Sequence, residues 1–84
     1  MVAIINENGL RVMIYANDHR PAHVHIWGAG FEIVALLNCP VGPLEEREVK
    51  GDISKAGVRK VLKSLQPKVS EMCKAWRKQH GSYY

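Results

Sequence analysis

Long apolar runs and signs of export are absent from this sequence of 84 residues. No apolar run exceeds strand length, as in Ile33–Leu37, whereas a helix that spans a bilayer needs roughly 18–20 apolar residues. The start of the chain, Met1–Glu7, lacks the basic residues and the apolar stretch of a secretory signal. We therefore expect a cytoplasmic protein that has no membrane partner.

Cysteine is also scarce. The two cysteines, Cys39 and Cys73, lie far apart in the sequence and form no Cys-x-x-Cys motif. We expect the first in a loop and the second in a helix. This pattern predicts two free thiols in a reducing compartment, and a disulfide between them is the less favoured alternative.

Several catalytic motifs are missing as well. Gly28-Ala29-Gly30 is not followed by a predicted helix, so it indicates a turn and not a phosphate-binding loop. No serine or cysteine nucleophile has a recognisable paired base, which disfavours hydrolysis through a covalent intermediate. The chain has no internal repeat, and its length predicts a single domain over residues 1–84.

Positive charge is concentrated near the C-terminal end. Residues 1–54 contain four basic and seven acidic residues, a balance of −3, and residues 55–84 contain eight basic residues and one acidic residue, a balance of +7. Such a split favours an anionic partner, although a solvated helix face explains it as well. The candidate contact residues for nucleic acid or another anion are Arg59, Lys60, Lys63, Lys74, Arg77 and Lys78.

The first part of the chain, residues 1–50, has the pattern of an antiparallel sheet. Short apolar or alternating segments are separated by turn residues such as Asn8-Gly9. The last segment is strongly charged, which is typical of an edge strand. The expected strands are Val2–Ile5, Leu10–Ala16, Ala22–Trp27, Phe31–Asn38 and Glu45–Lys50.

The remaining segment, about residues 54–80, has the pattern of an amphipathic helix that begins at a cap, Asp52 or Ser54, and ends at Gly81. Pro67 interrupts this helix, but the apolar residues keep the same phase on both sides of it. We therefore expect an α+β fold, in which four to five antiparallel strands (a hairpin plus a meander) pack on a kinked or broken C-terminal helix.

Three histidines are gathered around the start of the third predicted strand. His23 and His25 are two positions apart, so their rings project from one face of the strand, and His19 lies in the preceding loop. The alternation places this face opposite the apolar core. The candidate binding residues are Arg11, Tyr15, His19, His23, His25 and Trp27.

Three interpretations of this face stay open. Imidazole is a good ligand for zinc or copper, but spacing does not place Asp18 or Glu32 as a further ligand, so we assign no metal ligand and expect no cofactor. A metal-independent ribonuclease also uses Arg, Tyr and His on a sheet, with histidine as the acid–base group. The rings can instead simply pack against aromatic neighbours. We assign no catalytic residue, and the sequence does not decide whether the chain is an enzyme.

The run Asp18-His19-Arg20-Pro21-Ala22-His23-Val24-His25 resembles a family of small bacterial proteins, domain of unknown function 4160. His19, Pro21, His23, Val24 and His25 match its His-x-Pro-Pro-His-Val-His type motif, and Ala22 departs from it. The early hairpin and the late helix that ends near Trp76 extend the resemblance over essentially the whole chain. The resemblance implies a second small protein as partner, in an arrangement similar to toxin–antitoxin pairs.

We therefore expect a small interaction module of a toxin–antitoxin-like pair, which binds a partner protein and, through its basic helix, nucleic acid. One alternative is a ribonuclease that uses His23 or His25 with Arg11 and Tyr15. The other is a metal-binding protein that uses His19, His23 and His25. A straight helix about 40 Å long would extend past strands about 20 Å long, so the helix must bend, break or overhang. An overhanging apolar stripe would favour a homodimer.

Overall fold

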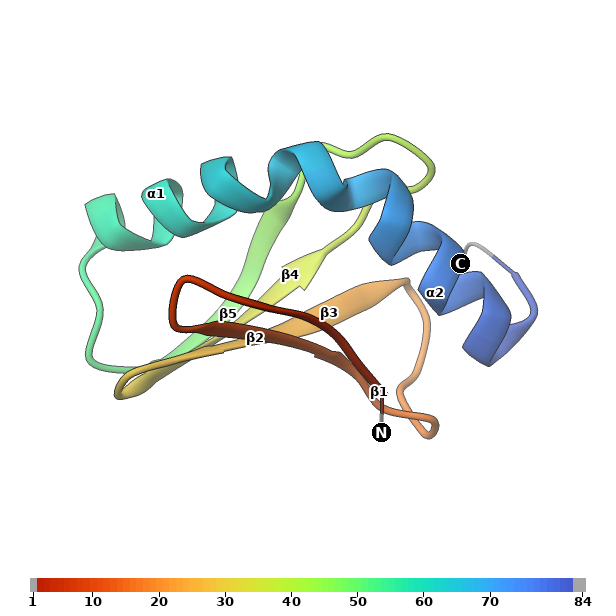
Figure 1. The fold of residues 1–84 in the computed structure, drawn as a ribbon, viewed down its shortest axis with the longest axis horizontal. Helices are drawn as coiled ribbons and strands as arrows, with labels where there is room; N and C mark the ends of the chain where they lie inside the picture. The colour runs from red at the N-terminus through yellow and green to blue at the C-terminus, as the bar shows by residue number, and fades with distance from the viewer. Residues whose placement is uncertain (1, 83–84) are drawn as a thin grey trace.

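The computed structural model describes residues 2–82 as two layers, an open five-stranded antiparallel sheet and one helical segment that lies across it (Figure 1). The strands follow one another along the sheet in the order of the sequence. They are β1 (Val2–Glu7), β2 (Leu10–Ile14), β3 (His23–Gly28), β4 (Phe31–Leu36) and β5 (Glu45–Gly51). The predicted α+β class, with a hairpin plus a meander, is confirmed.

A tight turn joins the first two strands. Asn8 and Gly9 both have positive φ angles, 52° and 74°, as the two central residues of a type I′ hairpin turn require. β1 therefore continues to Glu7, two residues past the predicted end of this strand at Ile5.

The charged strand β5 lies at one edge of the sheet and pairs with β4 alone, as predicted. Its pairing is irregular at one point. Val34 lies opposite Glu48 and Ala35 lies opposite Glu46, which leaves Arg47 as an extra residue in a β-bulge.

The helical segment consists of α1 (Lys55–Leu65), the 3₁₀ turn η1 (Gln66–Lys68) and α2 (Val69–His80). Ser54, and not Asp52, caps its start, because the Ser54 hydroxyl accepts a 3.0 Å hydrogen bond from the backbone N–H of Gly57. Gly81 ends α2 with a φ of 83°. A 3₁₀ turn accommodates Pro67 without a loop, so the apolar phase is preserved across it.

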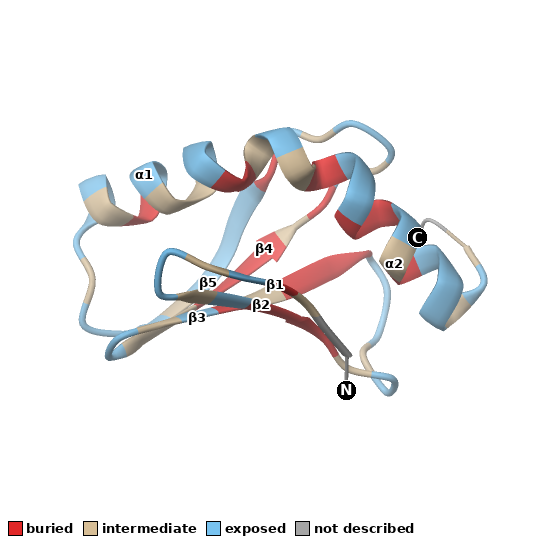
Figure 2. Ribbon diagram, in the orientation of Figure 1, coloured by how far each residue is buried: buried red, intermediate tan, exposed pale blue. Residues whose placement is uncertain are grey.

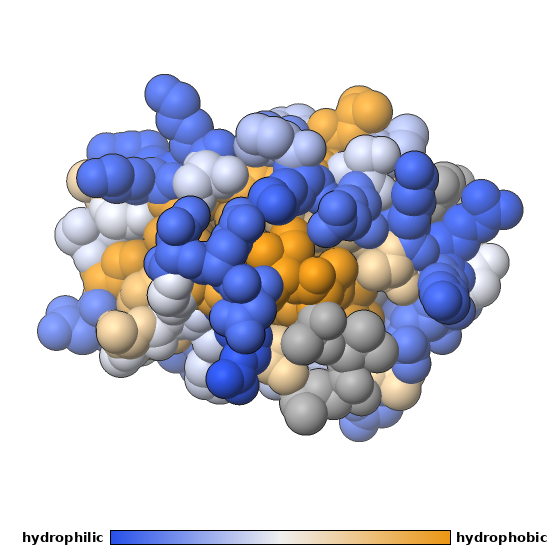
Figure 3. Space-filling view, viewed as in Figure 1, coloured by the Kyte–Doolittle hydropathy of each residue, from blue (hydrophilic) through white to orange (hydrophobic). Residues whose placement is uncertain are grey.

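The core lies between the helical segment and one face of the sheet, as Figure 2 shows by the burial of the facing residues. In the space-filling view, hydrophobic atoms occupy the space between the two layers, and hydrophilic atoms cover much of the outer surface (Figure 3). The largest fully buried side chains are Trp76, Ile14, Ile26, Ile33, Leu37, Leu65, Met72, Val12, Val24, Val69 and Cys73. Within residues 2–82, no helix covers the other face of the sheet (Figure 1).

The prediction of free thiols is wrong, because Cys39 and Cys73 form a disulfide. The loop after β4 passes beside α2 and brings the Cα atoms of the two cysteines to 5.7 Å, although they are 34 positions apart in the sequence. Sequence spacing cannot reveal such a long-range contact. A cytoplasmic location therefore loses its support from free thiols and stays a prediction. Among the helices of residues 2–82, none is long and apolar enough to cross a membrane.

Candidate metal centre

Two histidines of β3 form one side of a small cluster of polar side chains at the end of the sheet near α2. They project from the sheet face opposite the core, where His25 pairs with Met13 on β2 and with Val34 on β4. The side chain of His23 is 7% exposed and that of His25 is 16% exposed. The rings are therefore largely shielded from solvent.

Asp18 reaches the same cluster from the loop between β2 and β3. Its carboxylate accepts a 3.1 Å hydrogen bond from the backbone N–H of Tyr15, and its own N–H donates to the carbonyl of Tyr15, also at 3.1 Å. This local turn is a common device of aspartate side chains in loops. It fixes the carboxylate 3.3 Å from Nε2 of His25 and 3.6 Å from Nε2 of His23.

The other ring nitrogen of each histidine has a hydrogen-bond partner of its own. Nδ1 of His23 lies 2.8 Å from the carbonyl oxygen of Pro21, and Nδ1 of His25 lies 2.9 Å from a carboxylate oxygen of Glu32. These oxygens accept hydrogen bonds, so each Nδ1 donates its hydrogen. The Nε2 atom of each ring faces the carboxylate of Asp18, and that of His25 lies within hydrogen-bond distance of it at 3.3 Å.

Glu32 is brought to His25 by the register of the sheet. It lies on β4 opposite Trp27, two positions from Val34, which lies opposite His25. Glu32 and His25 are thus diagonal neighbours on one face, within reach of each other's side chains. The side chain of Glu32 is 11% exposed, and that of Asp18 is 14% exposed. Within residues 2–82, each of these two carboxylates forms ion pairs with histidines. Two largely shielded carboxylates therefore need positive charge at this cluster.

Three of the facing groups lie close enough together that they could hold one metal ion. One ligand atom each from Asp18, His23 and His25 lies within 4.8 Å of the others. Two ligands that are both about 2.0–2.1 Å from a tetrahedral zinc ion are about 3.3–3.4 Å apart. The separations of 3.3 and 3.6 Å between Asp18 and the two Nε2 atoms fit this spacing.

A chain of ring contacts connects the cluster to the core. The ring of Tyr15 meets that of His25 with centroids 4.6 Å apart, and the rings of His25 and His23 are 5.3 Å apart. The ring of His23 lies 5.3 Å from the indole of Trp76, which stacks on His80 at 3.9 Å. The packing role expected for these histidines is therefore present together with their polar contacts.

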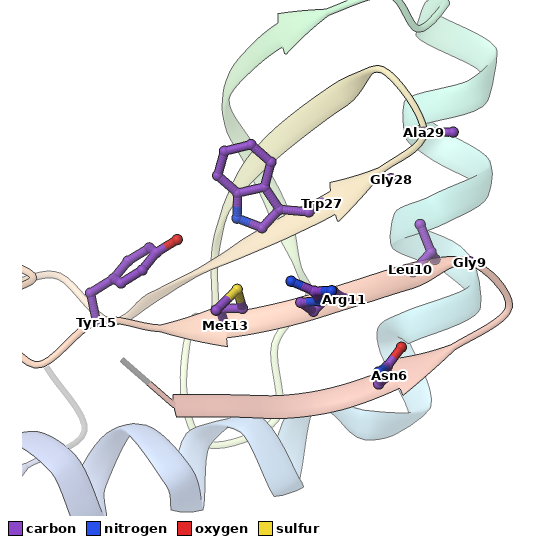
Figure 4. A pocket seen from close by; sticks show the side chains of 9 residues that line it. All are labelled: Asn6, Gly9, Leu10, Arg11, Met13, Tyr15, Trp27, Gly28 and Ala29. Carbon is purple, nitrogen blue, oxygen red and sulfur yellow. The ribbon is translucent and has the colours of Figure 1, made fainter.

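The cluster opens into a cavity of about 410 Å³ on the outer face of the sheet. A neighbouring groove of about 600 Å³ lies on the same face and is lined partly by Arg11, Met13, Tyr15 and Trp27 (Figure 4). Trp27 is 40% exposed at the edge of this groove. Tyr15 lines the groove and His25 lines the cavity, and the rings of these two residues are in contact.

The structure brings together some of the predicted site residues and separates others. His23 and His25 lie side by side, whereas Arg11 and Trp27 line the groove and not the cluster. His19 is exposed at the edge of the cavity, outside the group of facing ligand atoms. The six basic residues of the helix are exposed on the opposite layer.

Asp18 and Glu32 are the residues that sequence spacing could not place. Asp18 lies a few residues after the end of a strand, and the side chain of such an aspartate often hydrogen-bonds to the nearby backbone. This tendency was the indication that the sequence offered for the position of its carboxylate. The position of Glu32 beside His25 follows only from the register in which β3 and β4 pair. A β-bulge puts Arg47 in the cavity, and no sequence pattern marked that position.

The fold and the cluster define a small two-layer α+β protein with a histidine–carboxylate centre at the end of its sheet. A family model described as Domain of unknown function (DUF4160) matches residues 9–77, and the chain therefore belongs to this family, as its motif predicted. The matched segment contains all the residues of the cluster. No curated protein and no solved structure matches the chain.

Proposed function

We propose that this chain is a metal-binding protein, in which Asp18, His23 and His25 hold one divalent transition-metal ion. The observation that carries the proposal is the pair of Nε2 atoms that face one carboxylate at 3.3 and 3.6 Å while both Nδ1 atoms are engaged elsewhere. Ligating histidines in metalloproteins usually have this arrangement, with the second nitrogen donating to a carbonyl or a carboxylate.

The distances from Asp18 are longer than those of a strong direct ion pair with a protonated histidine. A charge-assisted N–H···O hydrogen bond is about 2.7–2.9 Å long, and both separations from Asp18 are longer. An ion between the groups explains the distances and supplies the positive charge that the two carboxylates need. Two imidazole nitrogens and one carboxylate oxygen suit zinc best, because magnesium prefers a full octahedron of oxygen ligands.

The arrangement makes the ribonuclease alternative less suitable. Both ring nitrogens of His25 are engaged, one by Glu32 and the other by Asp18. A general acid or base needs a nitrogen within hydrogen-bond reach of the substrate. Arg11, which that mechanism requires, lines the groove and not the cavity.

Calorimetric titration of zinc into metal-stripped protein tests the proposal. We expect one site with a micromolar or lower dissociation constant and a melting temperature that rises with free zinc. Asp18→Asn and His25→Gln should each weaken binding at least tenfold.

His19→Gln is the matched control, because it removes a histidine of the same motif that lies outside the ligand group, and it should bind zinc as the wild type does. Loss of zinc in His19→Gln with retention in Asp18→Asn would show that the three-histidine set is the correct one. Absence of zinc binding would refute the proposal.

A second surface supports the interaction role that the sequence predicts. The basic residues of α1 and α2 are all exposed, at positions other than the buried ones that pack on the sheet. They are Arg59, Lys60, Lys63, Lys74, Arg77 and Lys78. We propose that this basic face binds an anionic partner, either an acidic surface of a small partner protein in a toxin–antitoxin-like pair or nucleic acid.

Binding of a labelled single-stranded RNA at several salt concentrations tests for the nucleic-acid partner. Its affinity should fall steeply as salt rises, and Lys60→Glu with Lys63→Glu should abolish it. The control is Lys50→Glu, which changes a lysine of the other layer and should have little effect. A pull-down with the product of the neighbouring gene tests for the protein partner. If neither partner binds, the basic face is a solvated surface.

A further inference from the structure

The cavity over the proposed metal centre has the size of a small-molecule site. Its volume of about 410 Å³ falls in the range of pockets that hold small ligands. Residues from the β2–β3 loop and from three strands line it. These are Asn17, Asp18, His19, His23, His25, Glu32, Val34, Arg47, Glu48 and Lys50.

The β-bulge in β5 determines which side chain of that strand enters the cavity. Glu48 lies opposite Val34 on the outer face, and Val49 lies opposite Ile33, a core residue. In a regular strand, residue 47 would share the core side with Val49. The bulge breaks this alternation, and Arg47 lines the outer cavity next to Glu48. Bulges that redirect a side chain in this way are frequent beside functional sites.

The charges around the cavity leave Arg47 available to a ligand. Glu32 is paired with His25 at 2.9 Å, and Glu48 is paired with Lys50 at 3.3 Å. In the described part of the chain, Arg47 forms no ion pair with a carboxylate. Its exposed guanidinium is therefore a positive group at this cavity that can meet a ligand together with the metal ion.

Three protein ligands leave one position of a tetrahedral ion open, as in catalytic and ligand-binding zinc sites. We infer that this position and Arg47 together bind the phosphate group of a small phosphorylated molecule, an inference that rests on the metal-binding function proposed above. A phosphate group can give one oxygen to the metal and two others to the guanidinium in parallel hydrogen bonds. A carboxylate has two oxygens and cannot satisfy both groups in this way.

Calorimetric titration of inorganic phosphate into protein already loaded with one equivalent of zinc tests the inference. We expect saturable binding that weakens at least tenfold in zinc-free protein and in Arg47→Gln. Acetate should bind more weakly than phosphate. The control is Lys55→Gln, which removes an exposed positive charge at the start of α1, outside the proposed basic face, and should leave phosphate binding unchanged.

The preceding zinc titration of each variant separates this inference from the function on which it rests. Arg47→Gln should bind zinc normally and lose phosphate alone. Equal phosphate binding by Arg47→Gln and wild type, equal binding with and without zinc, or acetate binding as tight as that of phosphate would overturn the inference. So would failure of zinc-loaded protein to bind phosphate. Failure to bind zinc would overturn both proposals.

Discussion

The indole ring of Trp76 lies 5.3 Å from the imidazole ring of His23, so one residue of the helical core contacts the proposed metal centre directly. Trp76 has no exposed surface, and His23 is 6% exposed. The packing of the helical segment on the sheet therefore also determines where one ligand of the centre lies. Stability of the fold and geometry of the site depend on the same contact.

Replacing Trp76 should destabilise the protein strongly. Trp76→Ala removes a large, fully buried side chain and leaves a cavity, so we expect the free energy of unfolding to fall by about 3–5 kcal/mol in urea denaturation without metal. Trp27→Ala is the matched control. Trp27 is 40% exposed, and its removal should change stability by about 0.5 kcal/mol or less. Similar losses in both variants would show that Trp76 does not anchor the helix.

Glu32 should act through His25 and not as a metal ligand. Its carboxylate lies 2.9 Å from Nδ1 of His25 and orients that ring. We expect Glu32→Gln to weaken zinc binding by about 10–100-fold, measured by competition with a coloured chelator, because loss of such an outer partner has this effect in metal sites. Glu46→Gln, an exposed change on β5, should bind zinc as the wild type does. Unchanged zinc affinity in Glu32→Gln would contradict this role.

The disulfide should contribute measurably to stability. It closes a segment of 34 positions, for which the loss of chain entropy in the unfolded state predicts roughly 3–4 kcal/mol. Thiol alkylation of the purified, non-reduced protein under denaturing conditions should label neither cysteine. Cys39→Ala with Cys73→Ala should then melt at a clearly lower temperature, and a reductant should not lower it further. Alkylation of both cysteines before reduction would show free thiols.

The regular parts of this fold could be predicted because each depends on a local pattern. Alternation in β2 and β3 placed Val12 and Val24 on the core side, and helical phase placed Leu65 and Trp76 there. The same alternation placed His23 and His25 on the other face. These predictions require the period of an element and no knowledge of its neighbours.

The remaining features depend on contacts between distant segments. The Cys39–Cys73 disulfide arises where a loop meets α2, and the contact between Glu32 and His25 arises from strand register. Arg47 enters the cavity through a bulge that interrupts alternation. None of these relationships has a period or spacing in the sequence, so Glu32 as the partner of His25 and Arg47 as a cavity residue could be assigned only from the structure.

The position of a bound metal ion tests the central claim most directly. Crystals grown with zinc, measured on both sides of the zinc absorption edge, should show one anomalous peak between Asp18, His23 and His25. The peak should lie about 2.0–2.2 Å from a carboxylate oxygen of Asp18 and from Nε2 of each histidine. A peak bound through Nδ1, a peak that involves His19 in place of Asp18, or no peak at this cluster in zinc-saturated crystals would contradict the account.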